Sequence, residues 1–229
     1  MISRIGILKR KSSMTTAEFR HHWREIHGPL AARLPRLREY YHHYVTDASQ
    51  LGIDHARGAW EVDGFSEIVF DSIEDMNAAL ASQQFQPTIG DVKTYTDDIR
   101  LVVCEKHVVA PFDAAAGPAV KRMSILTRRP DIDEARFRDE WRGKHAADVP
   151  HLPGLRGYSQ NVVLDRYAAM ARKASYEDVP VDGVVELWFP DAEAIKTAFA
   201  SPQANITQTH ALSFIDKITT FLVETHRIA

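Results

Sequence analysis

The sequence predicts an α+β fold of two tandem ferredoxin-like βαββαβ units, whose antiparallel sheets pack into an intramolecular α+β barrel, a pseudo-dimer. Two observations predict this fold. The phrase F-x-x-x-W-x-x-x-H occurs at Phe19–His27 and again at Phe137–His145, an offset of 118 residues (137 − 19 = 118). Around each copy, short apolar runs and longer amphipathic segments follow in the same order, strand, helix, strand, strand, helix, strand. The chain therefore contains a duplicated unit.

The composition agrees with two small units. The chain has 229 residues, of which 45% are hydrophobic and 26% charged, as in an ordinary globular protein. We predict units at residues 1–109 and 120–229, joined by the linker 110–119, because APFDAAAGPA has the Pro, Gly and small residues of a connecting segment. A unit of this size buries only ~65% of its unfolded surface, so each should leave an apolar sheet face for the other to cover.

Strands and helices are placed by local patterns. The strands expected first are Ile5–Leu8 and Met123–Leu126. A first helix follows in each unit, with N-caps at Thr15 and Asp133, and the first helix is expected to end at Gly28–Pro29. The remaining strands are expected at 40–45, 65–70 and 99–105, then at 158–164, 184–189 and 218–224, with second helices starting near Ser72 and Asp191 and polar loops at 46–62 and 165–181.

Several classes of protein are excluded by what the sequence lacks. The net charge is −3 and there is no long basic run, so we expect no nucleic-acid partner. The longest apolar runs are too short for a membrane, so we expect a cytoplasmic protein. The single cysteine, Cys104, lies in an apolar run and is expected to be a small buried hydrophobe. No metal-binding or nucleotide-binding motif is present, so no metal and no cofactor are expected.

The repeated motifs resemble a known family. The F-x-x-x-W-x-x-x-H helix, the L-P-x-L-R-x-Y segment, the D-G turn and the E-x-x-F strand are similar to those of the EthD family, within the dimeric α+β barrel superfamily. The resemblance covers roughly 1–108 and 121–228 and implies the fold stated above. It implies function more broadly, since relatives and superfamily neighbours include lactone isomerases, dehydratases, cofactor-free monooxygenases and haem-handling proteins.

The histidines that end the repeated helix phrase are the first candidate catalytic residues. His27 and His145 lie beside the buried stripe of their helices, at the C-terminal end. The helix dipole favours the charged imidazole there and burial favours the neutral one, so proton exchange near neutral pH is expected. The resemblance implies the same role, because these histidines match the catalytic one of lactone-isomerase-like relatives. The alternative is a core histidine that holds the helix end.

Tyrosines that open the second strands are the next candidates. Tyr40 and Tyr158 could donate a hydrogen bond to a substrate carbonyl or enolate, as an oxyanion hole does. Relatives use a tyrosine at this position, which supports the assignment; the alternative is an aromatic that packs on the sheet. His43, three residues after Tyr40, should face the opposite side of the sheet, and its counterpart is Asn161.

Other polar residues complete the predicted site. Glu67 and Glu186 sit between apolar strand residues, where a carboxyl would have a raised pKa and could act as acid or base or orient a histidine; the alternative is a solvated glutamate, or one paired with Arg38 or Arg156. Substrate binding is assigned to Trp23, Trp141, Arg38 and Arg156. The doubled Glu105-x-His107 and Glu224-x-His226 offer too few ligands for a metal and are expected at strand ends or between the halves.

These residues predict a cofactor-independent enzyme of small-molecule catabolism. Histidine and tyrosine would perform acid-base chemistry on a lactone, aromatic or ether-pathway intermediate, in an isomerisation, dehydration or oxygenation. A haem-handling or oxidoreductase-accessory protein and a non-catalytic binding module are the alternatives. Because His43, His55 and Trp60 set the first half apart from the second, the chemistry favours a working pocket in the first half. Association of two such chains into a homodimer stays open.

Overall fold

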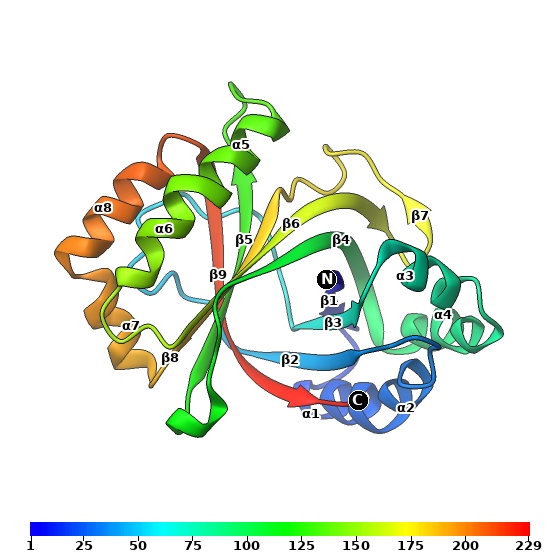
Figure 1. Cartoon of the computed structure of the whole chain (residues 1–229). Coiled ribbons are helices and arrows are strands. Elements are labelled where there is room, and N and C mark those ends of the chain that lie inside the picture. Colours follow the sequence, from blue (N-terminus) through cyan, green and yellow to red (C-terminus); the bar gives the residue numbers. More distant parts are fainter.

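A closed barrel with helices on two opposite sides is the frame of the molecule (Figure 1). The structure is a computed structural model that describes residues 1–229, apart from the side chain of Ala116. Helices of the first half lie on one side of the strands and helices of the second half on the other (Figure 1). The predicted α+β class is confirmed.

The elements of the two halves follow one another in the same order. The first half contains β1 (Ile2–Arg10), α1 (Thr16–His22), η1 (Trp23–His27), α2 (Gly28–Ala31), β2 (Glu39–Asp47), β3 (Gly64–Phe70), α3 (Ile73–Leu80), η2 (Gln83–Phe85), α4 (Gln86–Tyr95) and β4 (Thr96–Ala110). After η3 (Ala114–Ala116), the second half contains β5 (Val120–Arg128), α5 (Glu134–Glu140), η4 (Trp141–His145), α6 (Ala146–Asp148), η5 (Val149–His151), β6 (Gly157–Ala168), β7 (Arg172–Lys173), β8 (Gly183–Phe189), α7 (Ala192–Phe199), α8 (Pro202–Ala211) and β9 (Ile215–Arg227).

Strand order shows how the duplicated units close the barrel. The sheet runs β4-β1-β3-β2-β9-β5-β8-β6-β7, and β4 also pairs with β6. Each half contributes four strands in the ferredoxin-like order, and the second strand of each half pairs with the fourth strand of the other. The register places Tyr44 opposite Glu224 at one seam and Lys106 opposite Asn161 at the other. No edge of the eight-stranded barrel is left unpaired, which removes the exposed edges that promote aggregation.

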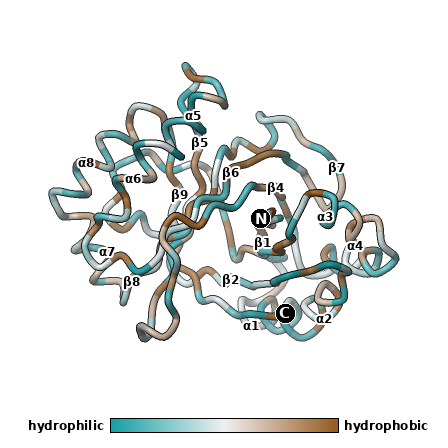
Figure 2. The backbone as a smooth tube through the Cα atoms, in the orientation of Figure 1, coloured by the Kyte–Doolittle hydropathy of each residue, from teal (hydrophilic) through white to brown (hydrophobic). Residues whose placement is uncertain are grey.

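Both faces of the sheet are buried. The face that points into the barrel carries an apolar layer that includes Ile5, Phe65, Val184 and Phe221. The outer face is covered by the helices, which form separate apolar clusters in the two halves. Figure 2 shows hydrophobic stretches along strands β1, β4 and β6, whereas helix α8 is largely hydrophilic. Cys104 is buried among the inner residues, as predicted.

The first helix of each half differs from the prediction at its end. The predicted caps are present: Thr15 and Glu18 form a capping box, and Asp133 accepts from the Arg136 amide. The predicted end at Gly28–Pro29 is wrong, because a π turn, η1, is followed by the further helical segment α2. Proline is tolerated there since it stands in the first turn of the new segment, where its missing N–H is not needed.

Two helices were not foreseen from the sequence. Helices α4 and α8 lie between the second predicted helix and the last strand of each half. Both contain a mixture of polar and small residues without a strong apolar stripe, as in QPTIGDVKTY of α4. Their stability comes from tertiary contacts such as those of buried Val92 and Tyr95, which a local pattern does not reveal.

The repeated D-G pair has a packing role in addition to its turn role. Asp63 accepts from the Arg10 amide at 2.9 Å, and Asp182 accepts from the Arg128 amide at 2.7 Å. The glycine that follows each aspartate begins β3 or β8 directly beneath the indole of the helix tryptophan, Trp23 or Trp141. A side chain at either glycine would overlap that indole.

We therefore expect Gly183→Ala to lower the free energy of unfolding by about 1–3 kcal/mol, because the added methyl group collides with the buried Trp141 ring. The matched control is Gly90→Ala in helix α4, where the space around the new methyl group is open. Alanine favours a helix interior over glycine by about 1 kcal/mol, so the control should be neutral or stabilising. Equal denaturation midpoints for Gly183→Ala and wild type would contradict the view that the close approach of the Trp141 indole requires glycine at this position.

Candidate active site

A hollow lies between the helices and the sheet in each half. In the first half it measures about 20 Å³ and is lined by His27 and Tyr40 among other residues. In the second half it measures about 60 Å³ and is lined by His145, Tyr158 and Trp141. The predicted histidine and tyrosine of each half therefore share a hollow. The larger space is in the second half, whereas the sequence favoured the first.

The π turns place the two histidines. Each π turn starts at the helix tryptophan and ends at the histidine, Trp23–His27 and Trp141–His145. A side chain four positions on lies on nearly the same helix face as the tryptophan, so each histidine stays beside its tryptophan, and the π turn adds one residue before the next helical segment begins. Such turns are frequent at functional sites, and the sequence carries no local signal for them.

A carboxylate engages the histidine of the first half. Nδ1 of His27 lies 2.9 Å from Oδ2 of Asp91, and Nε2 of His22 lies 2.9 Å from Oδ1 of the same carboxylate. Burial acts to raise the pKa of Asp91, but the contacts with both histidines outweigh it, so the pKa lies below its ordinary value. His27 is thus held by a structural partner from helix α4.

In the second half, a histidine takes the place of the aspartate that contacts His27. The residue equivalent to Asp91 is His210 (210 − 91 = 119), whose Nε2 lies 3.1 Å from Glu140. His145 instead contacts aromatic rings, with Phe214 at 5.4 Å and His210 at 5.6 Å between ring centroids. Its Nδ1 is shielded from water and has no hydrogen-bond partner within the described part of the chain. Burial lowers the pKa of His145 to about 3, so the imidazole is neutral at pH 7.

The tyrosine of the second half is arranged as a donor. The hydroxyl of Tyr158 accepts a hydrogen bond from Nε2 of Gln160 at 2.6 Å, and burial raises its pKa above the usual value. The phenol therefore keeps its proton and can donate it into the hollow. Tyr40 of the first half lies 2.7 Å from Nε2 of His42, which replaces Gln160 at the equivalent position.

A buried arginine from the first strand of each half adjoins the tyrosine. Arg122 and Tyr158 lie on either side of Leu187, in one row across β5, β8 and β6. Two strand spacings place their Cα atoms about 10 Å apart. Arg122 is 1% exposed, and burial lowers its pKa to about 9. Arg4 holds the same place in the first half, opposite Ile68.

Each hollow is covered by a loop from the other half. Ile53 and His55, from the long loop between β2 and β3, line the hollow of the second half, where the chain pairs at Ala56 with Lys217. Met170, from the corresponding loop of the second half, lines the hollow of the first, and its carbonyl accepts from Nη2 of Arg4 at 2.6 Å. The sites are therefore composite, and neither half forms one alone.

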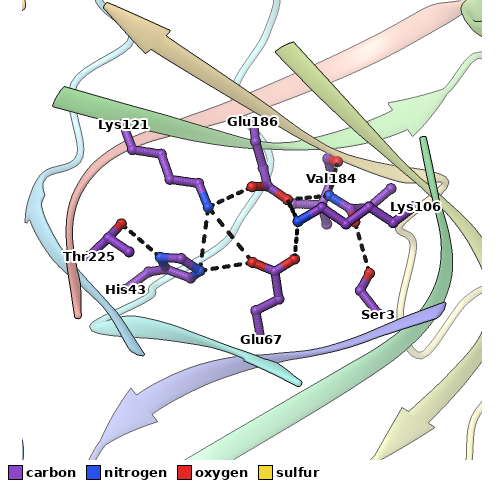
Figure 3. Close-up of polar contacts among 9 residues, drawn as sticks. Ser3, His43, Glu67, Lys106, Lys121, Val184, Glu186 and Thr225 are labelled. Carbon is purple, nitrogen blue, oxygen red and sulfur yellow. Dashed lines mark hydrogen bonds and ion pairs between the residues drawn. The ribbon is translucent and has the colours of Figure 1, made fainter. Parts of the chain in front are cut away.

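A separate polar cluster occupies the inside of the barrel (Figure 3). Lys106 contacts both carboxylates, with Nζ close to Glu67 and 3.2 Å from Oε1 of Glu186. Lys121 lies 2.5 Å from Oε2 of Glu186 and 3.8 Å from Glu67. His43 donates from Nε2 to Glu67 at 3.1 Å when that nitrogen carries the proton. These five side chains, termed the barrel network, border a cavity of about 790 Å³.

The barrel network corrects the expectation for the two glutamates. Burial acts to raise the pKa of Glu67, but Lys106, Lys121 and His43 outweigh it, so the pKa lies well below its ordinary value. The pKa of Glu186 is lowered as well, because the two ammonium groups outweigh burial and the neighbouring Glu67. Both are ionised, and they lie in the barrel, on the other face of the sheet from His27 and His145. His43 faces inward as predicted, and Asn161 bonds Glu186 in its place.

Other predicted site residues lie apart from the hollows. Arg38 is on the surface and pairs with Asp71 at 2.8 Å, while Arg156 is half-buried and donates to the Pro118 carbonyl at 2.7 Å. The structure does not bring either arginine to a hollow. Trp23 is fully buried and stacks on His42 at 4.1 Å. The Glu-x-His pairs lie on β4 and β9, at the seams between the halves, as one of the two expectations stated.

Sequence reasoning missed the arginine, lysine and loop residues of these sites. Arg122 and Lys121 stand in VKRMSILTR, where two adjacent polar residues interrupt an otherwise apolar strand. Because the barrel buries both faces of that strand, adjacent charges there must be buried on opposite sides. Two adjacent charged residues within a strand were therefore the sequence signal for Lys121 and Arg122. His55 was noted as a feature of the first half, but no sequence signal places it in the hollow of the second half, which it reaches through the fold of a long loop.

Fold and site together define a tandem ferredoxin-like α+β barrel protein with hollows between helices and sheet. The EthD domain profile matches residues 11–99 and 129–218, which is most of the chain in two copies. The protein belongs to the EthD family. No curated protein matches the sequence. The structure has no helix, in the range described, with the length and hydrophobicity needed to cross a bilayer.

Solved structures with the same architecture support the fold. An anthrone oxidase-like protein is 12% identical with a TM-score of 0.67, and the match covers 100% of this chain and 93% of that one. A proposed monooxygenase from Fusobacterium nucleatum is 6% identical with a TM-score of 0.61, covering 98% and 91%. A proposed monooxygenase from Lactobacillus acidophilus is 12% identical with a TM-score of 0.56, covering 100% and 94%. At these identities the likeness concerns the fold alone.

Proposed function

We propose that this protein is a cofactor-independent enzyme of small-molecule catabolism whose reaction takes place in the hollow of the second half. His145 would move a proton and Tyr158 would stabilise an enolate of a lactone, aromatic or ether-pathway intermediate. Isomerisation, dehydration and enolate oxygenation all pass through such a state. The observation that supports this proposal is that both side chains line one mainly apolar hollow, which is also the larger of the two.

The electrostatics of the hollow suit this chemistry. His145 is neutral at pH 7 because burial lowers its pKa, so it is able to accept a proton from a carbon acid. The enolate that forms is negative, and a negative charge in an apolar space raises the pKa of the adjacent imidazole toward the working pH. The Tyr158 hydroxyl donates to the enolate oxygen without losing its own proton, since burial raises its pKa.

Proton exchange tests the proposal without knowledge of the product. A panel of enolisable lactones and aromatic ketones is incubated with the protein in D₂O, and deuterium uptake at the carbon next to the carbonyl is followed by NMR. We expect His145→Gln to slow exchange by about 10²–10⁴-fold and Tyr158→Phe by about 10²–10³-fold. The matched controls, His27→Gln and Tyr40→Phe, should retain most of the rate because the first hollow is too small.

Three results bear against this proposal in different ways. Exchange that survives His145→Gln would remove histidine as the base. Exchange that is lost only in the first-half variants would move the site to the other hollow. Binding of panel compounds without exchange or product would indicate a non-catalytic binding module, the alternative function expected from the sequence.

Haem was the other alternative expected from the sequence, and neither hollow fits it. Its axial ligand would be His27 or His145, at the π turns. Nδ1 of His27 is engaged by Asp91, and the adjoining hollow measures about 20 Å³. The hollow beside His145, at about 60 Å³, is larger but still far below the volume of a macrocycle.

A further inference from the structure

Arg122 is a buried charge without a counter-ion in the hollow of the second half. Its side chain lines the hollow and is 1% exposed. Nη2 donates to the Thr220 hydroxyl at 3.2 Å, while Nε and Nη1 have no partner among the residues described. The guanidinium lies over the Phe199 ring at 4.3 Å, and no carboxylate pairs with it within the same range of residues. A charge buried in this way is expensive unless something else neutralises it.

The equivalent arginine of the first half provides a direct comparison. Arg4 is also buried, and its Nη2 donates to the carbonyl of Met170, delivered by the loop that covers its hollow; only its Nε is shielded from water without a partner, against two such nitrogens on Arg122. The loop that covers the second hollow delivers His55 instead. Neither nitrogen of His55 has a partner in the described structure. The second hollow thus retains unused donors and three times the volume of the first, about 60 Å³ against 20 Å³.

The lining of the hollow limits what could satisfy Arg122. Apart from Arg122, the polar lining consists of Ser124, Thr207, Gln208, the Tyr158 hydroxyl and the ring nitrogens, and none of these carries a negative charge. The other walls are apolar, with Leu152, Leu187 and Phe199 among them. Arg122 supplies one positive charge, and at neutral pH the nearby His145 is uncharged because its pKa is lowered. A ligand with one negative charge and an apolar body matches this surface in both charge and polarity.

We propose that the second-half hollow binds the carboxylate group of a small organic acid, held by the Arg122 guanidinium through a free N–H on Nε or Nη1 together with the second N–H of Nη2, with the apolar part of the acid toward His145 and Tyr158. This inference rests on the proposed function and names the class of its substrate. A planar guanidinium offers two parallel N–H groups that match the two oxygens of a carboxylate. A phosphate dianion fits less well, since one of its charges would stay unpaired against apolar walls.

Simple carboxylates are the probe. Acetate, propionate and butyrate are titrated into the full-length protein by calorimetry at constant ionic strength, with acetamide and inorganic phosphate as comparisons. We expect saturable binding of the carboxylates that strengthens with chain length, and no binding of acetamide. Loss of a charged hydrogen-bond donor should weaken binding about 10–100-fold in Arg122→Met. The matched control, Arg4→Met, should bind as the wild type does.

A second variant protects the result from a folding defect. Arg122→Lys keeps the positive charge but loses the two parallel N–H groups of the guanidinium. It should therefore bind carboxylates more weakly than wild type and more tightly than Arg122→Met. The inference is overturned if wild type shows no saturable carboxylate binding, if Arg122→Met binds undiminished, or if phosphate binds more tightly than every carboxylate. Carboxylate binding without proton exchange would overturn only the proposed function. Exchange that depends on His145, without carboxylate binding, would overturn only this inference.

Discussion

Glu67→Gln is expected to lower the free energy of unfolding by about 3–5 kcal/mol, the range found when one member of a buried ion pair is removed. In the barrel network, two carboxylates balance two ammonium groups, and both glutamates are at most 1% exposed. The substitution keeps the shape but leaves Lys106 and Lys121 to share Glu186. An unbalanced positive charge then remains inside the barrel. Urea denaturation measures the loss.

Two companion variants show whether the loss comes from the buried charge. Glu61→Gln removes an exposed carboxylate that pairs with Lys9, and a surface pair of this kind contributes about 0–1 kcal/mol. Adding Lys106→Met to Glu67→Gln restores charge balance and should recover part of the stability. A Glu67→Gln midpoint equal to that of the Glu61→Gln control would show that the barrel network contributes nothing to folding.

Stability is expected to fall steeply with acid, beginning near pH 6.5. Burial, with Lys121 adding to it, lowers the pKa of His43 to about 4, and burial also lowers the pKa of His42, His55 and His145. Between these values and the ordinary 6.5, the unfolded chain binds protons that the folded chain does not, so stability decreases as pH falls. Each histidine lowers the free energy of unfolding by up to about 1.4 kcal/mol for each pH unit in that window.

The carboxylates extend the effect to lower pH. The pKa values of Glu67 and Glu186 lie below the ordinary 4.5 in the folded protein, because the two lysines outweigh burial. Their contribution is therefore fully present above pH 4.5 and is lost as pH falls further. Thermal melts from pH 8 to pH 3 should show one loss that starts near 6.5 and a second that starts near 4.5.

The second half supplies the control for the histidine effect. His43→Asn reproduces the pairing of Asn161 with Glu186, in which Nδ2 donates to the carboxylate at 2.6 Å. The variant should keep the Glu67 hydrogen bond. The free energy of unfolding should then fall less steeply between pH 6.5 and pH 4, by the contribution of one histidine. An unchanged slope would mean that His43 does not titrate as its burial predicts.

The sequence by itself determined the architecture. A phrase repeated at a constant offset, with caps at Thr15 and Asp133 and D-G pairs at fixed places, specified two copies of one βαββαβ unit. A ferredoxin-like unit buries only one face of its sheet against its helices, so the other face required a cover, and the second copy provides it. The pairing of histidine with tyrosine in each hollow also followed from these positions, since they belong to one repeated local motif.

Only the tertiary structure decided which groups share a site and in what electrical state. Glu67 and Glu186 were expected beside the histidines with raised pKa values, yet the barrel sets them together with two lysines that lower those values. Arg122 and His55 join His145 because strand register and a loop from the opposite half meet there. Helix and strand patterns depend on near neighbours in the chain, whereas charge pairing and burial depend on residues that folding brings together from far apart.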